Sequence, residues 1–250
     1  DGAMVFRAMT DGATTSGSKY ARSELREMNG SERAAWKLSE GGTMSATLRI
    51  DELPSRTDGS GGRMVVGQIH GKDNELIRLY YEDGTVHFVN DRAGSGNKET
   101  TFTFKNARGE SPSIGLGEKF SYMIDAHGNT LTVKVFADGQ EYSSVTSINS
   151  IWQSDELYFK AGVYLGINET SGRGSGQASF YGLDFSHKAG AGLGGWKAGV
   201  DGGTPDPVPL PPSDDPHPPV IVPPERTTVQ LNGDARDNVI TGGKIGRASC

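Results

Sequence analysis

The chain has 250 residues, of which 34% are hydrophobic and 22% charged, and its formal net charge is -6 at pH 7. The 36 glycines and 12 prolines disfavour a helical bundle, because both residues break helices. No apolar run approaches the roughly 20 residues of a membrane-spanning helix. The negative net charge disfavours a general nucleic-acid binder. The chain has a single cysteine, Cys250, which excludes an intrachain disulfide and a CxxC metal or redox site.

Residues 1–188 contain short segments in which apolar and polar residues alternate, as they do in half-buried strands. These segments occupy residues 43–53, 62–71, 75–84, 85–91, 100–106, 119–129, 130–140, 157–166 and 178–188. Turn signals such as Asp83-Gly84 and Asp138-Gly139 separate them and indicate hairpins. Residues 31–39 suit either a helix or a strand. The pattern predicts an all-β domain, an antiparallel sandwich or jelly roll.

Three segments each combine one apolar face with one polar face, since residues two apart on a strand share a face. Their polar faces carry Arg22, Glu24 and Arg26, then Gln68 and His70, then Tyr158, Lys160 and Tyr164. If the three strands are neighbours in one sheet, these faces merge into a cationic, hydrogen-bonding surface that suits an anion. Taken singly, each face is more typical of a solvated strand with modest cross-strand pairing than of a functional site.

In this order the three segments resemble the signature regions of the alginate lyases of polysaccharide lyase family seven. That family carries Arg-(Ser/Thr)-Glu-Leu-Arg, Gln-(Ile/Val)-His and Tyr-Phe-Lys-Ala-Gly-x-Tyr, which read RSELR, QIH and YFKAGVY here. The resemblance implies an antiparallel β-jelly roll sandwich over residues 1–188, with a concave substrate groove and with the N-terminus truncated. One departure concerns subsite contacts: many members continue the third motif with Asn-Gln, where this chain has Leu165-Gly166.

The resemblance also implies a reaction. Alginate is a 1,4-linked polymer of mannuronate and guluronate, and a lyase removes the C5 proton and expels the O4 leaving group, which leaves a 4,5-unsaturated uronate. Charge that develops on the C5 carboxyl group must be stabilised by donors. The family gives this role to residues matching Arg22 and Gln68, with help from His70.

Acid and base roles follow from the same resemblance. Tyr164 is expected as the general acid, and either His70 or Tyr164 as the base, depending on the epimer; His70 suits the base role because its unperturbed pKa is near 6.5. Arg26, Lys160, Glu24 and Tyr158 are expected to bind substrate or to orient the groups that do. No metal or other cofactor is required by this scheme, and His87, His127 and His187 are interpreted as ordinary surface or core histidines.

A linker is predicted at residues 189–226, which are rich in glycine and proline. Ten of the 12 prolines lie between Pro205 and Pro224, where they favour an extended polyproline II conformation. A ligand for a proline-reading domain is the alternative interpretation of this stretch.

Residues 227–243 resemble the start of a truncated calcium-binding β-roll repeat, G-G-x-G-x-D-x-apolar-x. One partial repeat cannot complete a calcium site, so no metal site is predicted for this chain, and this region is the single place where calcium is considered at all. Residues 244–250 (KIGRASC) are interpreted as a sequencing or cloning artefact. With no visible signal peptide, the β-roll resemblance suggests an extracellular protein exported by type I secretion.

The sequence therefore predicts a lyase that cleaves alginate by β-elimination, acting as a monomer, with no nucleic-acid or membrane partner. Two alternatives stay open: a non-catalytic uronan-binding module, and a lyase on another polyuronate such as glucuronan. A pure binding module needs cations and aromatic residues but no acid–base pair. The joint presence of Arg22, Gln68, His70 and Tyr164 therefore favours the enzyme.

Overall fold

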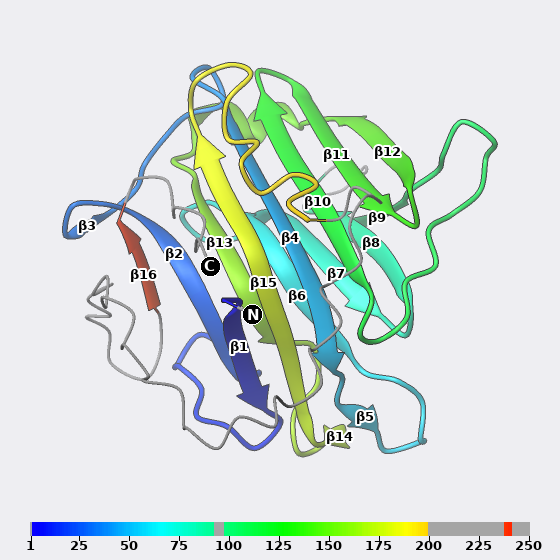
Figure 1. Ribbon diagram of the computed structural model, residues 1–250. Coiled ribbons are helices and arrows are strands. Elements are labelled where there is room, and N and C mark those ends of the chain that lie inside the picture. Colours follow the sequence, from blue (N-terminus) through cyan, green and yellow to red (C-terminus); the bar gives the residue numbers. More distant parts are fainter. Residues whose placement is uncertain (1, 93–97, 200–237, 242–250) are drawn as a thin grey trace, which may run out of the picture.

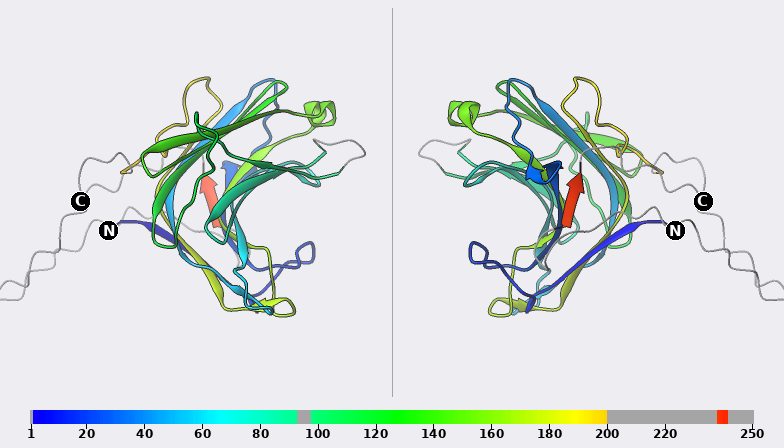
Figure 2. Two further views of the ribbon diagram at one scale, coloured as in Figure 1. Left: turned by 90° about the vertical axis from the view of Figure 1, so that its right-hand side faces the viewer. Right: turned by 90° about the vertical axis from the view of Figure 1, so that its left-hand side faces the viewer.

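The computed structural model describes residues 2–92, 98–199 and 238–241, and these residues form two stacked, curved β-sheets (Figures 1 and 2). The six-stranded sheet has the order β1 (Met4–Met9), β15 (Ser175–Ser186), β4 (Gly42–Glu52), β10 (Lys119–His127), β11 (Thr130–Ala137) and β12 (Gln140–Ser147). All its pairings are antiparallel. The predicted all-β antiparallel sandwich is thus confirmed.

The eight-stranded sheet has the order β16 (Asn238–Thr241), β2 (Arg22–Asn29), β13 (Tyr158–Leu165), β6 (Arg63–His70), β7 (Glu75–Glu82), β8 (Thr85–Asn90) and β9 (Thr100–Thr103), with β3 (Glu32–Arg33) paired to β2. The pairing of β16 with β2 is parallel, and the others are antiparallel. Two short strands, β5 (Ser55–Arg56) and β14 (Gly172–Arg173), pair with each other, and η1 (Ser150–Ser154) is a short 3-10 helix.

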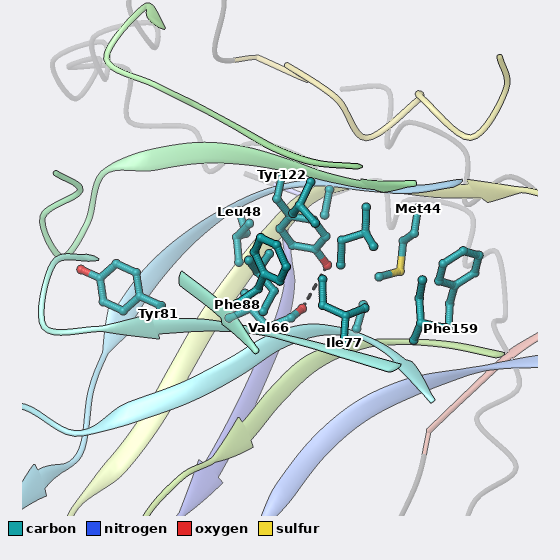
Figure 3. Close-up of a cluster of buried hydrophobic side chains, with 14 of the residues drawn as sticks. Met44, Leu48, Val66, Ile77, Tyr81, Phe88, Tyr122 and Phe159 are labelled. Carbon is teal, nitrogen blue, oxygen red and sulfur yellow. Dashed lines mark hydrogen bonds between the residues drawn. The ribbon is translucent and has the colours of Figure 1, made fainter. Parts of the chain in front are cut away.

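The hydrophobic core lies between the two sheets (Figure 3). Met44 and Leu48 of the six-stranded sheet face Val66 and Phe159 of the other, and burial of such side chains drives the sheets together. Tyr122 spans the core and donates a hydrogen bond of 3.0 Å to the carbonyl oxygen of Val66. We call the face of the eight-stranded sheet that points away from this core its outer face.

Local sequence signals explain the connections. Asp83-Gly84 and Asp138-Gly139 form tight hairpin turns in which all four residues have positive φ, as the turn chemistry predicts. Residues 31–39, which suited a helix or a strand, form no helix. Trp36 instead bridges to Leu157 through backbone hydrogen bonds of 2.8 and 3.1 Å, and its buried ring packs on Phe159.

The folded domain extends past the predicted boundary at residue 188. Residues 189–199, expected as the start of the linker, lie against the six-stranded sheet on the side that points away from the core. Ser45 Oγ donates to the carbonyl oxygen of Gly192, and Thr47 Oγ1 donates to that of Gly195, both at 2.7 Å. Glycines allow this close approach, because an added Cβ at either position would overlap the sheet backbone.

Beyond residue 199 the structure describes only β16 (Asn238–Thr241), which lies within the segment predicted to resemble a β-roll repeat. The rest of the linker, most of the β-roll segment and residues 244–250 lie outside the described residues. Among the described residues no helix has the length and apolarity needed to cross a membrane.

Candidate active site

The three motif strands are direct neighbours, in the order β2, β13, β6. Lys160 lies between Arg26 on one side and Gln68 on the other, while Tyr158 pairs with His70 and Tyr164 with Arg22. The expectation that the strands share a sheet is therefore confirmed. Their apolar residues, Leu25, Ile69, Phe159, Ala161 and Val163, all belong to the core, so the polar residues lie on the outer face.

Glu24 links the three strands beneath this face. Its carboxylate accepts a 2.6 Å hydrogen bond from Nζ of Lys160 and another from Nε2 of Gln68, and it lies 3.6 Å from a guanidinium nitrogen of Arg22. Glu24 is 1% exposed and Lys160 2%, which makes this a buried ion pair. One carboxylate therefore holds the side chains of both Gln68 and Lys160 in position.

Gln68 is 1% exposed, and its Oε1 has no hydrogen-bond partner among the described residues. An amide nitrogen carries two N–H donors, of which Glu24 occupies one. Gln68 thus keeps unused hydrogen-bonding capacity at the bottom of the outer face, where a bound polar group would satisfy it.

Arg22 and Tyr164 form a cation–phenol pair. The guanidinium carbon of Arg22 lies 4.3 Å from the centre of the Tyr164 ring. The hydroxyl of Tyr164 is 3.2 Å from Oγ of Ser18, and its ring is 6.3 Å from that of Tyr20. Tyr164 is partly exposed, so its hydroxyl is within reach of a ligand on this face.

His70 is oriented through its backbone neighbour. Nδ1 lies 2.7 Å from the carbonyl oxygen of Gly71, and since a carbonyl only accepts, Nδ1 carries the proton and Nε2 presents a lone pair. Burial lowers the pKa of His70 below 6.5, and Lys160 lowers it further, although the Gly71 hydrogen bond, Glu75 and Glu24 act in the opposite direction. At neutral pH His70 is therefore a neutral imidazole whose Nε2 can accept a proton.

Cations surround Tyr158, which stacks on His70 with ring centres 5.1 Å apart. The guanidinium carbon of Arg26 is 5.9 Å from the Tyr158 ring and that of Arg33 is 4.9 Å from it. Sequence reasoning did not include Arg33, because it lies outside the three motifs. The structure brings all eight predicted site residues onto or directly beneath the same face.

The face continues along the start of β6 and over β7 and β8, with residues that the motifs did not indicate. These are Arg63, Arg78, Tyr80 and His87, and the guanidinium carbons of Arg63 and Arg78 lie 5.1 and 5.8 Å from the Tyr80 ring. His87, interpreted as an ordinary histidine, stacks on Tyr80 at 5.2 Å, and burial lowers its pKa.

The other two histidines lie elsewhere. His127 packs against Gly41, and Nε2 of His187, which is partly exposed, lies 2.6 Å from the buried carboxylate of Glu27. Within the described part of the chain, no group of three or more His, Cys, Asp or Glu side chains is arranged to hold a metal ion.

Comparison with known proteins agrees with this geometry. A family model described as alginate lyase matches residues 1–187. An alginate lyase from Klebsiella pneumoniae is 35% identical over 234 residues, which cover 75% of this chain and 76% of the relative.

Solved structures give the same result. The crystal structure of the alginate lyase from Klebsiella pneumoniae superposes with a TM-score of 0.64 at 33% identity, covering 76% of this chain and 83% of the other. A family 7 alginate lyase crystallised with the product GGG gives a TM-score of 0.61 at 29% identity, covering 75% and 81%. The expected β-jelly roll is confirmed by these neighbours. The chain belongs to the alginate lyase family and is a polysaccharide lyase that acts on alginate.

Proposed function

We propose that Arg22, Gln68, His70 and Tyr164 carry out the β-elimination on the outer face of the eight-stranded sheet. The observation that supports this most directly is their register: Tyr164 pairs with Arg22 on β2, while Gln68 and His70 project from the next strand, β6. A guanidinium, an amide, an imidazole and a phenol therefore share one face of three neighbouring strands, with Arg22 beside Tyr164 and with Gln68 and His70 further along the β13–β6 pair.

Arg22 and Gln68 neutralise the C5 carboxylate in this scheme. As the C5–H bond breaks, its electron pair moves toward C4 and the carboxyl group, and charge on that group must be stabilised by donors already in place. The planar guanidinium of Arg22 matches a carboxylate, and its contact with Glu24 is 3.6 Å, longer than a hydrogen bond. The second N–H of Gln68 supplies a neutral donor.

His70 and Tyr164 move the protons. Nε2 of His70 takes the C5 proton, and the hydroxyl of Tyr164 donates its proton to O4 as the C4–O4 bond breaks. Where the C5 hydrogen lies on the side of the phenol, Tyr164 in its phenolate form takes that proton and returns it to O4 as the C4–O4 bond breaks.

Glu24 and Lys160 act below the reacting groups. Because their charges are buried and bound to each other, we assign them to positioning: Glu24 fixes the amide of Gln68, and Lys160 keeps Glu24 in place. Arg26 is partly exposed and is assigned to binding of a neighbouring sugar, whereas Tyr158, which is 5% exposed and stacks on His70, is assigned to supporting Arg26 and His70.

Three further assignments complete the proposal. The reaction uses side chains for charge neutralisation, so activity is expected to survive a chelator. The chain acts as a monomer. It works outside the cell, exported by type I secretion, which the β-roll resemblance of residues 227–243 supports.

The test is a product assay on the purified full chain. Alginate, mannuronate-rich and guluronate-rich blocks and glucuronan are each incubated with the enzyme, and unsaturated ends are followed by their ultraviolet absorbance. Ends that form on alginate blocks, with and without EDTA, support the proposal. A chain that binds alginate without producing such ends would instead be a uronan-binding module, and turnover confined to glucuronan would reassign the substrate.

A further inference from the structure

Arg63 extends the cationic face beyond the catalytic residues. It is the first residue of β6, and its guanidinium carbon lies 5.1 Å from the centre of the Tyr80 ring. Tyr80 packs with Val65, Val89 and Tyr164 in a cluster separate from the main core. Arg63 is thus joined to the proposed general acid by a continuous patch of side chains.

The charge of Arg63 is uncompensated. Glu82 lies opposite it on β7, but the carboxylate of Glu82 is bound by Arg56 at 2.5 Å. Arg63 forms no ion pair with a carboxylate of the described residues, and its buried Nε has no hydrogen-bond partner there. Arg78, on the other side of Tyr80, differs because it is bound to Glu99 and lies 3.6 Å from Asp91.

Gly166 leaves the space that Arg63 occupies. A Cβ added at Gly166 would lie 2.6 Å from Cγ of Arg63 and 2.8 Å from its Nε. Position 166 is also the place where the motif of the resembled family continues with glutamine. In this chain a larger residue at position 166 would overlap the Arg63 side chain and force it to move.

We propose that Arg63 binds a uronate carboxylate at a subsite beside the reacting sugar, and that Gly166 makes room for it. Tyr80 lies two strands from Tyr164, roughly 10 Å away at a strand spacing of about 4.8 Å, so the sugar concerned is a neighbour of the one that reacts. The uncharged Tyr80–His87 stack provides a surface for its ring. The inference rests on the proposed function, since it places another sugar of the same substrate.

The first test compares Arg63→Gln with the wild-type chain and with Arg7→Gln, an exposed arginine on β1 of the opposite sheet. Arg63→Gln is expected to raise KM for polymeric alginate about tenfold, the effect of losing one charge-assisted hydrogen bond, with kcat nearly unchanged. Oligosaccharides too short to reach the subsite should not distinguish variant from wild type. The KM of the variant should also depend less on salt.

The second test is Gly166→Gln, alone and combined with Arg63→Gln. If the introduced side chain acts by displacing Arg63, the double variant should resemble Arg63→Gln and the two effects should not add. An unchanged KM in Arg63→Gln, or additive effects in the double variant, would overturn the inference. Wild-type chain that releases no unsaturated product would overturn the proposed function instead, so the two failures are distinguishable.

Discussion

Nδ1 of His70 lies 2.7 Å from the carbonyl oxygen of Gly71, the residue that follows it. This contact fixes the tautomer, so that the lone pair of Nε2 points away from the backbone. Nε2 in turn lies 3.8 Å from the carboxylate of Glu75, the first residue of β7. A proton taken up at Nε2 would therefore meet a negative charge, and Glu75 is expected to stabilise the imidazolium.

The pH dependence of the reaction should report on this arrangement. Since burial lowers the pKa of His70, the neutral base persists below pH 6.5, and the acidic limb of kcat/KM is expected to fall below that value. Glu75 raises this pKa, so Glu75→Gln should move the limb to still lower pH. Kinetics across the acidic range would check both shifts, with His127→Gln as the control. A limb above pH 6.5 in the wild type would contradict the assignment.

Replacement of Tyr164 by phenylalanine removes the proposed acid and leaves its ring in place. We expect Tyr164→Phe to abolish formation of unsaturated ends while binding of alginate oligosaccharides, followed by calorimetry, stays close to wild type. Tyr181→Phe is the matched control, because Tyr181 also lies beside two cations, Arg49 and Lys119, but on the opposite sheet. Substantial turnover by Tyr164→Phe would reassign the acid role.

Much of the site could be predicted because alternation along a strand follows directly from sequence. RSELR, QIH and YFKAGVY each place their polar residues on one side, and the structure aligns those sides. What alternation cannot give is register. The ion pair of Lys160 with Glu24 depends on which residues of β13 and β2 lie opposite, and this is set by packing of the whole sheet.

The position of Arg63 does not follow from alternation along the strand. Strict alternation along β6 places Arg63 and Val65 on the face opposite to Gln68 and His70. The structure has a bulge between Val65 and Gly67, which shifts the alternation and brings both ends of the strand to the outer face. Gly67 lies against the ring of Tyr122, a long-range contact that no local pattern reveals.

The predicted end of the domain was too early for a related reason. The glycine-rich residues 189–199 have the composition of a flexible segment, yet their glycines fit against Ser45 and Thr47 on β4. Glycine-rich composition shows that a segment lacks side chains, but it does not show whether another part of the chain offers a surface that the segment can pack against. Here that surface is β4, which lies more than a hundred residues earlier in the sequence.

The buried ion pair between Glu24 and Lys160 should affect stability and activity differently. Glu24→Gln leaves the Lys160 ammonium buried without its carboxylate, which is expected to cost about 3–5 kcal/mol of unfolding free energy. Adding Lys160→Met should recover most of that stability, because the uncompensated charge is removed. Denaturant titration and kinetics of both variants would check this.

Activity should not recover with stability in that double variant, since Gln68 still lacks the carboxylate that positions it. A double variant as active as wild type would show that Glu24 has only a structural role. A single variant as stable as wild type would show that the ion pair does not contribute to folding.

His187 should make stability depend on pH. Burial opposes its charge, but the hydrogen bonds to Glu27 and to the Gly41 carbonyl outweigh burial and raise its pKa. A raised folded-state pKa means that the stabilisation is complete below the unfolded value of about 6.5 and is lost as pH rises through the folded value. His187→Gln should therefore cost about 1.5–3 kcal/mol at pH 6, and less at pH 9. Denaturant unfolding at both pH values measures the difference, and a cost that grows with pH would contradict it.

Gly195 tests whether residues 189–199 are an integral part of the fold. An alanine at this position would overlap the carbonyl group of Ser45 and the Cα of Ala46, which are backbone atoms that cannot move away alone. Gly195→Ala should therefore destabilise the chain by about 1–3 kcal/mol, the usual cost of overpacking. Gly17→Ala is the control, because nothing lies within 4 Å of an added Cβ there. Thermal unfolding of the two variants side by side gives the answer: equal midpoints would mean that the segment packs too loosely to stabilise the sheet.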